Sequence, residues 1–166
     1  MLNEKNLNFI IDKQKELDKY IETKWNITNN EEILSKKIVA LYVEICEFIN
    51  EQRAFKFWSN KKPSEKNILL EEYIDGIHFI VSIGYLTGFK PEDYNFAFQN
   101  NTIIDAYLNC LQKVGEFNKN RNVQFFTNML DAFFSIAKIL DFSEKEIIEA
   151  YIEKNKVNFE RQDNNY

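Results

Sequence analysis

Two pairs of acidic residues carry the strongest chemical signal in this sequence. Glu44 and Glu47 stand three residues apart in VEICEFINEQ, and Glu72 and Asp75 have the same spacing in LLEEYIDGIHF. Residues three apart project from the same side of an α-helix, so each pair would present two carboxylates together. Carboxylate oxygens are the protein ligands that Mg²⁺ prefers. The pattern therefore indicates a candidate site for a divalent metal.

The first pair belongs to a stretch with a clear helical pattern, which we expect to run from about Glu31 to Phe55. One side of this helix collects residues within about 60° of a common direction: Ile38, Leu41, Tyr42, Ile45, Phe48, Ile49 and Gln52. The acids Glu44, Glu47 and Glu51 lie roughly 100° to 160° away. Acids with this spacing are common on solvated helices, so surface charge is the better explanation of the first pair when it is taken alone.

The second pair lies in ILLEEYIDGIHFIVSIG, which is apolar nearly all round, as expected for a helix enclosed by neighbours. Glu72 and Asp75 share a stripe with Ile68 and Phe79, so we expect both carboxylates to face the interior. Ionised carboxylates buried without partners are strongly destabilising. The nearest basic residues in the sequence lie in or beside a loop: Lys61, Lys62 and Lys66. A divalent metal held between two antiparallel helices is the simplest interpretation.

The elements that must position these acids are all expected to be helices, because helical periodicity extends along nearly the whole chain and strict alternation is almost absent. Six helices are predicted, near residues 7–21, 31–55, 65–86, 102–118, 122–140 and 143–155. A polar loop, SNKKPSEKN, joins the two acidic helices, and TGFKPEDYNFAFQNN is a packed irregular segment. No repeat or domain boundary is visible, so we expect one all-α domain over residues 1–166.

Composition limits the possible functions and locations. The chain has 166 residues, 45% of them hydrophobic, and a net charge of −5, which argues against general nucleic-acid binding but leaves metal-chelated anions possible. Cys46 and Cys110 are interpreted as two buried, reduced thiols, which favours the cytoplasm. The N-terminus lacks the pattern of a signal peptide, and the most apolar run, IHFIVSIGYL, is too short to cross a membrane.

The order of the acids resembles a known superfamily. E-x-x-E followed after a loop by E-x-x-D is similar to the all-α NTP pyrophosphohydrolases, which include MazG-like enzymes and dimeric dUTPases. The stretches EQRAFKFWS, LLEEYIDGIHF and YIEKNKVNFERQDNNY resemble the dimeric dUTPases of Gram-positive bacteria and their phages, over essentially the whole chain. The resemblance implies a MazG-like bundle of about six helices that forms a homodimer and hydrolyses dUTP, and also dUDP, to dUMP with Mg²⁺.

The same resemblance assigns roles to the acids. Glu44, Glu47, Glu72 and Asp75 would hold the metals, and Glu47 would also orient or deprotonate the attacking water. These residue types suit the reaction, because phosphoryl transfer needs mainly positioning and charge neutralisation.

The C-terminal residues 154–166 form a candidate substrate-closing tail. Lys154, Asn158 and Arg161 recur at spacings of four and three, on one face if the last helix continues that far. By resemblance, Lys154 and Arg161 would bind phosphates, Asn158 would read uracil with its amide, and Tyr166 would contact substrate. Asn165 stands where the family often has Gly, and Asn tolerates a left-handed turn better than most residues. We expect the tail to be ordered mainly by bound nucleotide.

Four further residues have a structural and a functional interpretation. His78 is an ordinary helix residue or, from its place in IHF, a substrate contact. Trp58 is a core or interface aromatic, although the family places its segment beside the nucleotide, where Lys56 could face phosphates. Gln14 by itself would be a surface residue, and family position makes it a contact to uracil or sugar.

Two alternatives stay open. A MazG-like enzyme acting on another nucleotide would need the same four acids, and only the tail and FKFW favour uracil. A helical interaction or regulatory module could keep the scaffold without turnover. The intact set of acids argues against that second alternative, because a pure binding protein has no need of buried carboxylates.

Overall fold

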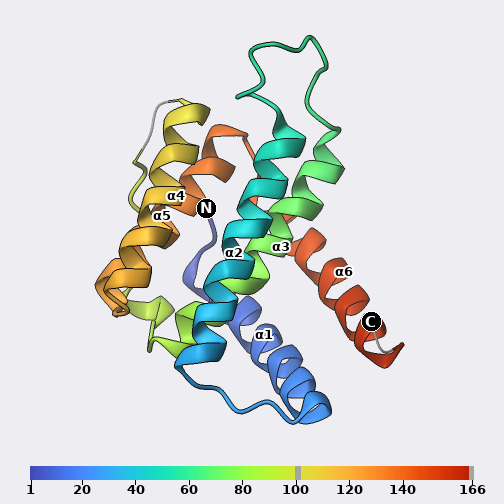
Figure 1. Ribbon diagram of the computed structural model, residues 1–166, viewed down its shortest axis with the longest axis vertical. Helices are drawn as coiled ribbons and strands as arrows, with labels where there is room; N and C mark the ends of the chain where they lie inside the picture. The colour runs from blue at the N-terminus through green and yellow to red at the C-terminus, as the bar shows by residue number, and fades with distance from the viewer. Residues whose placement is uncertain (100–101, 165–166) are drawn as a thin grey trace.

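Six α-helices and one short 3₁₀ helix make up the computed structural model, which describes residues 1–99 and 102–164, and no strand occurs within those ranges (Figure 1). The elements, in chain order, are α1 (Glu4–Trp25), α2 (Glu31–Gln52), α3 (Lys66–Leu86), η1 (Pro91–Asp93), α4 (Ile103–Lys119), α5 (Val123–Ile139) and α6 (Glu144–Asp163). The all-α fold class predicted from periodicity is confirmed.

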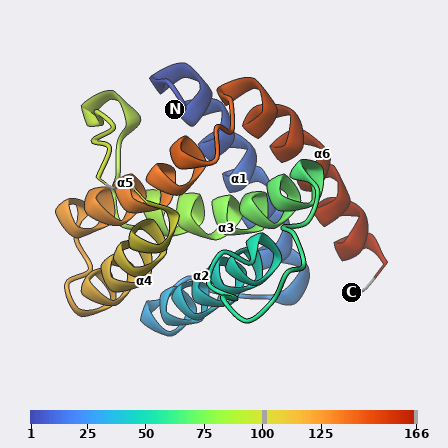
Figure 2. The same cartoon turned by 90° about the horizontal axis from the view of Figure 1, so that it is seen from above.

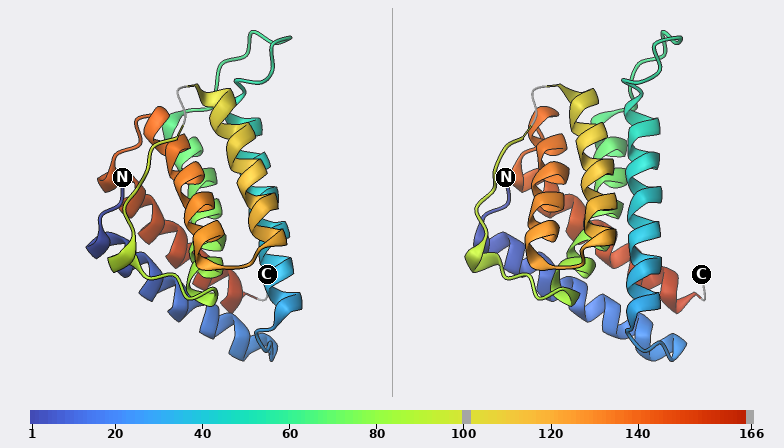
Figure 3. Two further views of the ribbon diagram at one scale, coloured as in Figure 1. Left: turned by 90° about the vertical axis from the view of Figure 1, so that its left-hand side faces the viewer. Right: turned by 60° about the vertical axis from the view of Figure 1, so that its left-hand side comes forward.

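Helix α3 lies at the centre of the bundle and contacts α1, α2, α5 and α6 (Figure 2). Its buried residues lie on nearly all sides, from Leu69 to Gly84, as its all-round apolar pattern predicted. Helices α2, α3, α4 and α5 run roughly alongside one another, whereas α1 and α6 cross them obliquely (Figure 3). This arrangement leaves one flank of α3 between α2 on one side and α1 and α6 on the other.

Two glycines of α3 allow α5 to approach closely. A Cβ at Gly76 would lie 2.9 Å from the Phe133 ring, and one at Gly84 would lie 2.5 Å from Phe126 Cζ. Such distances are too short for real side-chain contacts, so glycine is required for this packing. Since Gly76 directly follows Asp75, the same contact fixes how deeply the acidic segment of α3 sits in the bundle.

Helix ends follow local chemistry. The side chains of Asn3, Asn30, Thr102, Asn122 and Ser143 each accept a hydrogen bond from a backbone N–H in the first turn of the helix that follows. Helix α2 ends at Gln52, before the predicted Phe55, because Arg53 adopts a left-handed conformation with φ of 69°.

The structure corrects two further sequence-based expectations. Helix α6 continues to Asp163 and does not end near Asn155, and Trp25 Nε1 of α1 donates a hydrogen bond of 2.8 Å to Gln162 Oε1. Polar contacts to α1, which the sequence pattern does not reveal, therefore hold the end of this helix. Cys46 is exposed, because Ile45 beside it takes the core-facing position of α2, while Cys110 is buried as expected.

Among the described helices, none is by itself both long and apolar enough to cross a membrane, although α5 and α6 meet the criteria when counted together as a sharply bent pair.

Candidate active site

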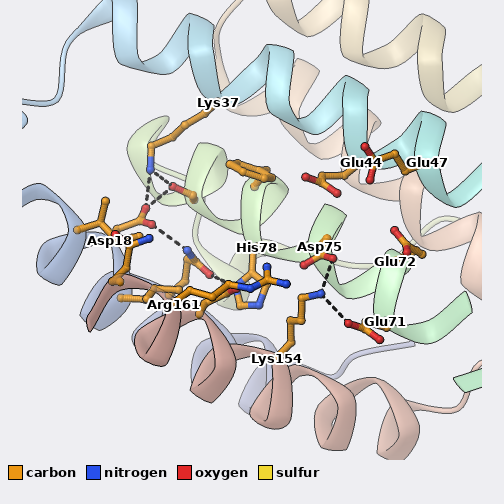
Figure 4. A pocket seen from close by; sticks show the side chains of 17 residues that line it. Asp18, Lys37, Glu44, Glu47, Glu71, Glu72, Asp75, His78, Lys154 and Arg161 are labelled. Carbon is orange, nitrogen blue, oxygen red and sulfur yellow. Dashed lines mark hydrogen bonds and ion pairs between the residues drawn. The ribbon is translucent and has the colours of Figure 1, made fainter. Parts of the chain in front are cut away.

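A cavity of about 550 Å³ opens between α1, α2, α3 and α6. Its lining combines acidic, basic and amide side chains with a few apolar ones (Figure 4). The lining residues are Gln14, Leu17, Asp18, Ile21, Lys37, Glu44, Glu47, Glu71, Glu72, Asp75, His78, Phe79, Ser82, Lys154, Asn158, Arg161 and Gln162. The predicted acids lie at one end of this cavity, and Asp18 with Lys37 lies at the other.

The acidic end brings together residues from two helices. Glu44, Glu72 and Asp75 each offer a carboxylate oxygen, and these three oxygens lie within 4.8 Å of one another. Glu47 lines the same cavity from a more exposed position. The three-residue spacing in α2 and in α3 turns each pair towards the space between the helices, so three of the four predicted acids converge and Glu47 lines the same cavity.

The electrostatics of this end favour a bound cation. Burial raises the pKa of Glu44 to about 7, and the neighbouring charges of Asp75, Glu47 and Glu72 add to the shift. The pKa values of Glu72 and Asp75 are also raised, mainly by burial. Carboxylates crowded in this way are destabilised when all are ionised, and a divalent cation removes that repulsion. The donor set consists of oxygens, which fits Mg²⁺.

Lys154 corrects the expectation that no basic residue reaches these acids. Its buried ammonium lies 2.7 Å from Asp75 Oδ2 and 2.9 Å from Glu71 Oε1 (Figure 4). Burial alone would lower the pKa of Lys154, but the hydrogen bonds to Asp75 and Glu71 raise it. The stripe of Glu72 and Asp75 is half-buried and faces the cavity instead of the apolar core. Packing of α6 on α3, which sequence neighbours do not reveal, supplies the cation.

The opposite end of the cavity is organised around Asp18, which sequence reasoning missed. Its carboxylate accepts hydrogen bonds from Gln14 Nε2 at 2.8 Å, Lys37 Nζ at 2.7 Å, Tyr85 OH at 2.5 Å and the Ser82 hydroxyl. Burial would raise the pKa of Asp18, but the Lys37 charge and these hydrogen bonds lower it below its ordinary value. Asp18 is therefore an ion buried with a full set of donors.

A signal for Asp18 was present in the sequence. Gln14 and Asp18 stand four residues apart among the apolar positions of the first helix, Leu7, Ile10 and Leu17. A polar pair on a core-facing stripe indicates a buried hydrogen bond. Gln14, which is 3% exposed, is not the surface residue that its local context suggested.

His78 lies between the two ends. Its Nδ1 is 2.7 Å from Gln14 Oε1, and its ring stacks on Tyr151 with the ring centres 4.7 Å apart. Burial, followed by the nearby Lys154 charge, lowers the pKa of His78 to about 3. Its Nε2 is buried without a hydrogen-bond partner among the described residues.

The C-terminal part of α6 closes the cavity on one side. Lys154, Asn158 and Arg161 all line it, so the predicted common face of these three residues is seen, and Gln162 joins them. Tyr166 lies outside the described residues.

Lys56 and Trp58 are placed elsewhere. Both belong to the loop between α2 and α3, which projects beyond the helix ends (Figures 1 and 3). The Trp58 side chain is 65% exposed, and Lys56 Nζ donates to the backbone oxygen of Asn50 at 3.1 Å. Neither lines the cavity of its own chain.

Comparison with known proteins identifies the family of this chain. A family model described as dUTPase matches residues 6–166, which is nearly the whole chain. No curated protein gives a match. The matched region contains every residue that lines the cavity.

Proposed function

Because this chain belongs to the dUTPase family, in its all-α branch, it is a dUTP diphosphatase, and we propose that the cavity between α1, α2, α3 and α6 is its active site. One observation carries this proposal. Three carboxylates that suit a divalent cation lie at one end of the cavity, and hydrogen-bonding groups that suit a nucleoside lie towards the other.

Glu44, Glu72 and Asp75 are proposed to hold Mg²⁺, with Glu47 as a further ligand. When bound, Mg²⁺ neutralises charge on the phosphates and lowers the pKa of a coordinated water. Glu47 lies outside the tight cluster of three oxygens and is the more exposed acid. It is therefore the acid best placed to orient the attacking water and accept its proton.

Lys154 and Arg161 are proposed to bind the phosphates. Both line the cavity from α6, on the side that faces the acidic end. Binding would transfer the Lys154 ammonium from Asp75 and Glu71 to a phosphate oxygen, and would leave Asp75 free for the cation. Positive charge placed on the phosphates stabilises the transition state of phosphoryl transfer.

Gln14, His78 and Asn158 are proposed to face the nucleoside. Each can offer a hydrogen-bonding group whose direction decides which base it accepts. The base and sugar would then lie on the Asp18 side of the cavity, and the triphosphate would lie on the acidic side. Residues 154–166 are proposed to close over the bound nucleotide.

We also propose that the protein is a homodimer. Helices α2 and α4 contact each other, and their outer sides expose Val39, Val43 and Leu108, with exposed fractions of 62%, 47% and 64%. Exposed apolar side chains on two helices that pack together are typical of an interface. A second copy would also account for the projecting loop, whose Trp58 and Lys56 do not reach the cavity of their own chain and are proposed to contact substrate in the partner's.

Pyrophosphate release from dUTP, dCTP, dTTP and dATP, with and without Mg²⁺, tests the assignment. We expect release from dUTP in the presence of Mg²⁺ and little from the others. Equal release from all four nucleotides would instead favour a general MazG-like activity. Turnover of dUTP unchanged by chelation of divalent ions would refute the metal site.

A further inference from the structure

A chain of hydrogen bonds with a fixed direction runs from Asp18 to His78. Asp18 Oδ1 accepts from Gln14 Nε2 at 2.8 Å, and Gln14 Oε1 lies 2.7 Å from His78 Nδ1 and 3.0 Å from the Tyr151 hydroxyl. All of these contacts are buried. The three side chains at its centre come from two helices, Asp18 and Gln14 from α1 and His78 from α3.

The direction follows from the charge on Asp18. An ionised carboxylate only accepts hydrogen bonds, so the part of Gln14 that faces it must be the NH₂ group. Gln14 Oε1 must then face His78 and Tyr151, and an amide oxygen also only accepts. His78 Nδ1 must therefore carry the proton. The lowered pKa of Asp18, held down by Lys37 and by the hydroxyl donors Ser82 and Tyr85, agrees with this assignment.

This tautomer determines what the other ring nitrogen of His78, Nε2, can bind. A neutral imidazole with its proton on Nδ1 has a free lone pair on Nε2. His78 Nε2 has no hydrogen-bond partner among the described residues, although the His78 side chain is 5% exposed and lines the cavity. Buried polar atoms left without a partner are uncommon and need an explanation. A ligand that donates a hydrogen bond supplies one.

We propose that Asp18 is a positioning residue for nucleoside recognition, which acts through Gln14 to hold His78 in the Nδ1–H form so that His78 Nε2 accepts a hydrogen bond from the bound nucleoside. The inference rests on the proposed function of the cavity. Deoxyuridine has two donors that could fill this role, the N3–H of the base and the 3′-hydroxyl of the sugar. Cytosine has no N3–H, so an acceptor at this position could also discriminate against dCTP.

The Asp18→Asn substitution makes a sharp prediction. Lys37, Ser82 and Tyr85 all donate to residue 18, so the new amide must turn its oxygen towards them and its NH₂ group towards Gln14. Gln14 then has to reverse its own amide and present NH₂ to His78 Nδ1. The imidazole proton consequently moves from Nδ1 to Nε2, which changes the recognition group from an acceptor to a donor.

Nuclear magnetic resonance can read this change directly, because His78 is the one histidine in the chain. Two-bond ¹H–¹⁵N spectra of the tag-free protein near neutral pH should show the Nδ1–H form in the wild type and the Nε2–H form in Asp18→Asn. Lys37→Met is the matched control, since it removes the ion pair but keeps the carboxylate that faces Gln14. It should retain the Nδ1–H form, as should the exposed substitution Asp12→Asn on the same helix.

The wild-type spectrum tests which ring nitrogen of His78 carries the proton, even if Asp18→Asn does not fold. An Nε2–H form in the wild type would overturn the proposal, and so would an unchanged Nδ1–H form in folded Asp18→Asn. Loss of the Nδ1–H form in Asp12→Asn would show that the tautomer does not depend on Asp18 in particular, which also contradicts the proposal.

Kinetics test the link to substrate. Asp18→Asn should lower kcat/KM for dUTP by about 10- to 100-fold and reduce the preference for dUTP over dCTP if N3–H is the donor. If the donor is the 3′-hydroxyl, wild-type protein should instead lose a similar factor with 2′,3′-dideoxyuridine triphosphate, and the variant should lose little more. No change in kcat/KM would refute the role in recognition. Absence of dUTP turnover in the wild type would refute the proposed function. The spectra would still show whether Asp18 sets the tautomer of His78 through Gln14.

Discussion

The Lys154 ammonium lies 2.7 Å from Oδ2 of Asp75, an acid that also belongs to the cluster in which oxygens of Asp75, Glu44 and Glu72 lie within 4.8 Å of one another. A cation from α6 is therefore already paired with one of the acids that could hold a metal. The pairing connects the two halves of the proposed chemistry, because the group that would bind phosphate is held by one of the groups that would bind Mg²⁺.

Replacing Lys154 should separate these two roles. Lys154→Met should lower kcat/KM for dUTP by about 100-fold or more, because a charge that stabilises the transition state is lost. The nucleotide-free variant should nevertheless bind Mn²⁺ more tightly than the wild type, since the competing ammonium is gone. Calorimetric titration measures the second effect. The exposed Lys156, two residues further along α6, provides a control that should change neither quantity.

Glu47→Gln should abolish most turnover while it preserves the fold. The amide keeps the shape of the side chain but cannot accept a proton from water, so we expect kcat to fall by roughly 100- to 1,000-fold. Steady-state kinetics and circular dichroism measure the two properties. Glu51→Gln is the comparison, because Glu51 contacts Ser64 and does not line the cavity. Near wild-type turnover in Glu47→Gln would contradict the mechanism.

Stability without divalent ions should fall as pH rises through the titration of Glu44. Its folded pKa of about 7 lies above its ordinary value of 4.5, so between these values the folded protein binds more protons than the unfolded chain. The free energy of unfolding therefore decreases with rising pH across that window. Mg²⁺ binds the ionised cluster and opposes the loss, so it should raise Tm more at about pH 8 than at about pH 5.5.

Thermal unfolding at both pH values, with Mg²⁺ and with a chelator, measures this difference. The Glu44→Gln variant should lose much of the pH dependence seen in the chelated protein. A Tm increment from Mg²⁺ that is the same at both pH values would show that the cluster is not where the ion binds.

Deleting residues 158–166 should leave a folded protein with little dUTPase activity. The buried anchors of α6, Ile147 and Tyr151, precede the deletion, whereas Asn158 and Arg161 are removed from the cavity. Asn158→Ala should weaken discrimination between dUTP and dCTP more than it weakens binding of triphosphate. Hydrogen exchange with and without a non-hydrolysable dUTP analogue and Mg²⁺ measures closure. Equal protection of the C-terminal segment in both states would count against a closing tail.

Leu108→Glu should disrupt the proposed homodimer. Its side chain is 64% exposed on α4, so the substitution should not disturb the core, but it would place a charge in an apolar interface. Light scattering at micromolar concentration should give a dimer for the wild type and a monomer for the variant. Ile152→Glu, at an exposed apolar position on α6, is the matched control. A wild-type mass near 19.9 kDa would exclude the dimer.

Much of the fold and one end of the site could be predicted from local pattern. Helical periodicity identified the six helices, because burying one side of a helix imposes a repeat that is visible in a short window. Glu44 with Glu47, and Glu72 with Asp75, were found for the same reason, since residues three apart share a helix face whatever the helix packs against.

Helix ends were less certain, because they depend on single residues and on distant partners. The left-handed conformation of Arg53 ended α2 early, and contacts such as that between Trp25 and Gln162 extended α6 beyond its apolar pattern.

The pairing of groups across helices was decided by the tertiary structure alone. The sequence by itself determined which residues are acidic, which are basic and which share a face. It did not determine that Lys154 meets Asp75, or that Lys37 and Ser82 meet Asp18, because each contact depends on how separate helices are rotated and crossed. The free energy that sets those rotations comes from burying apolar side chains over the whole bundle, to which the polar pairs then conform.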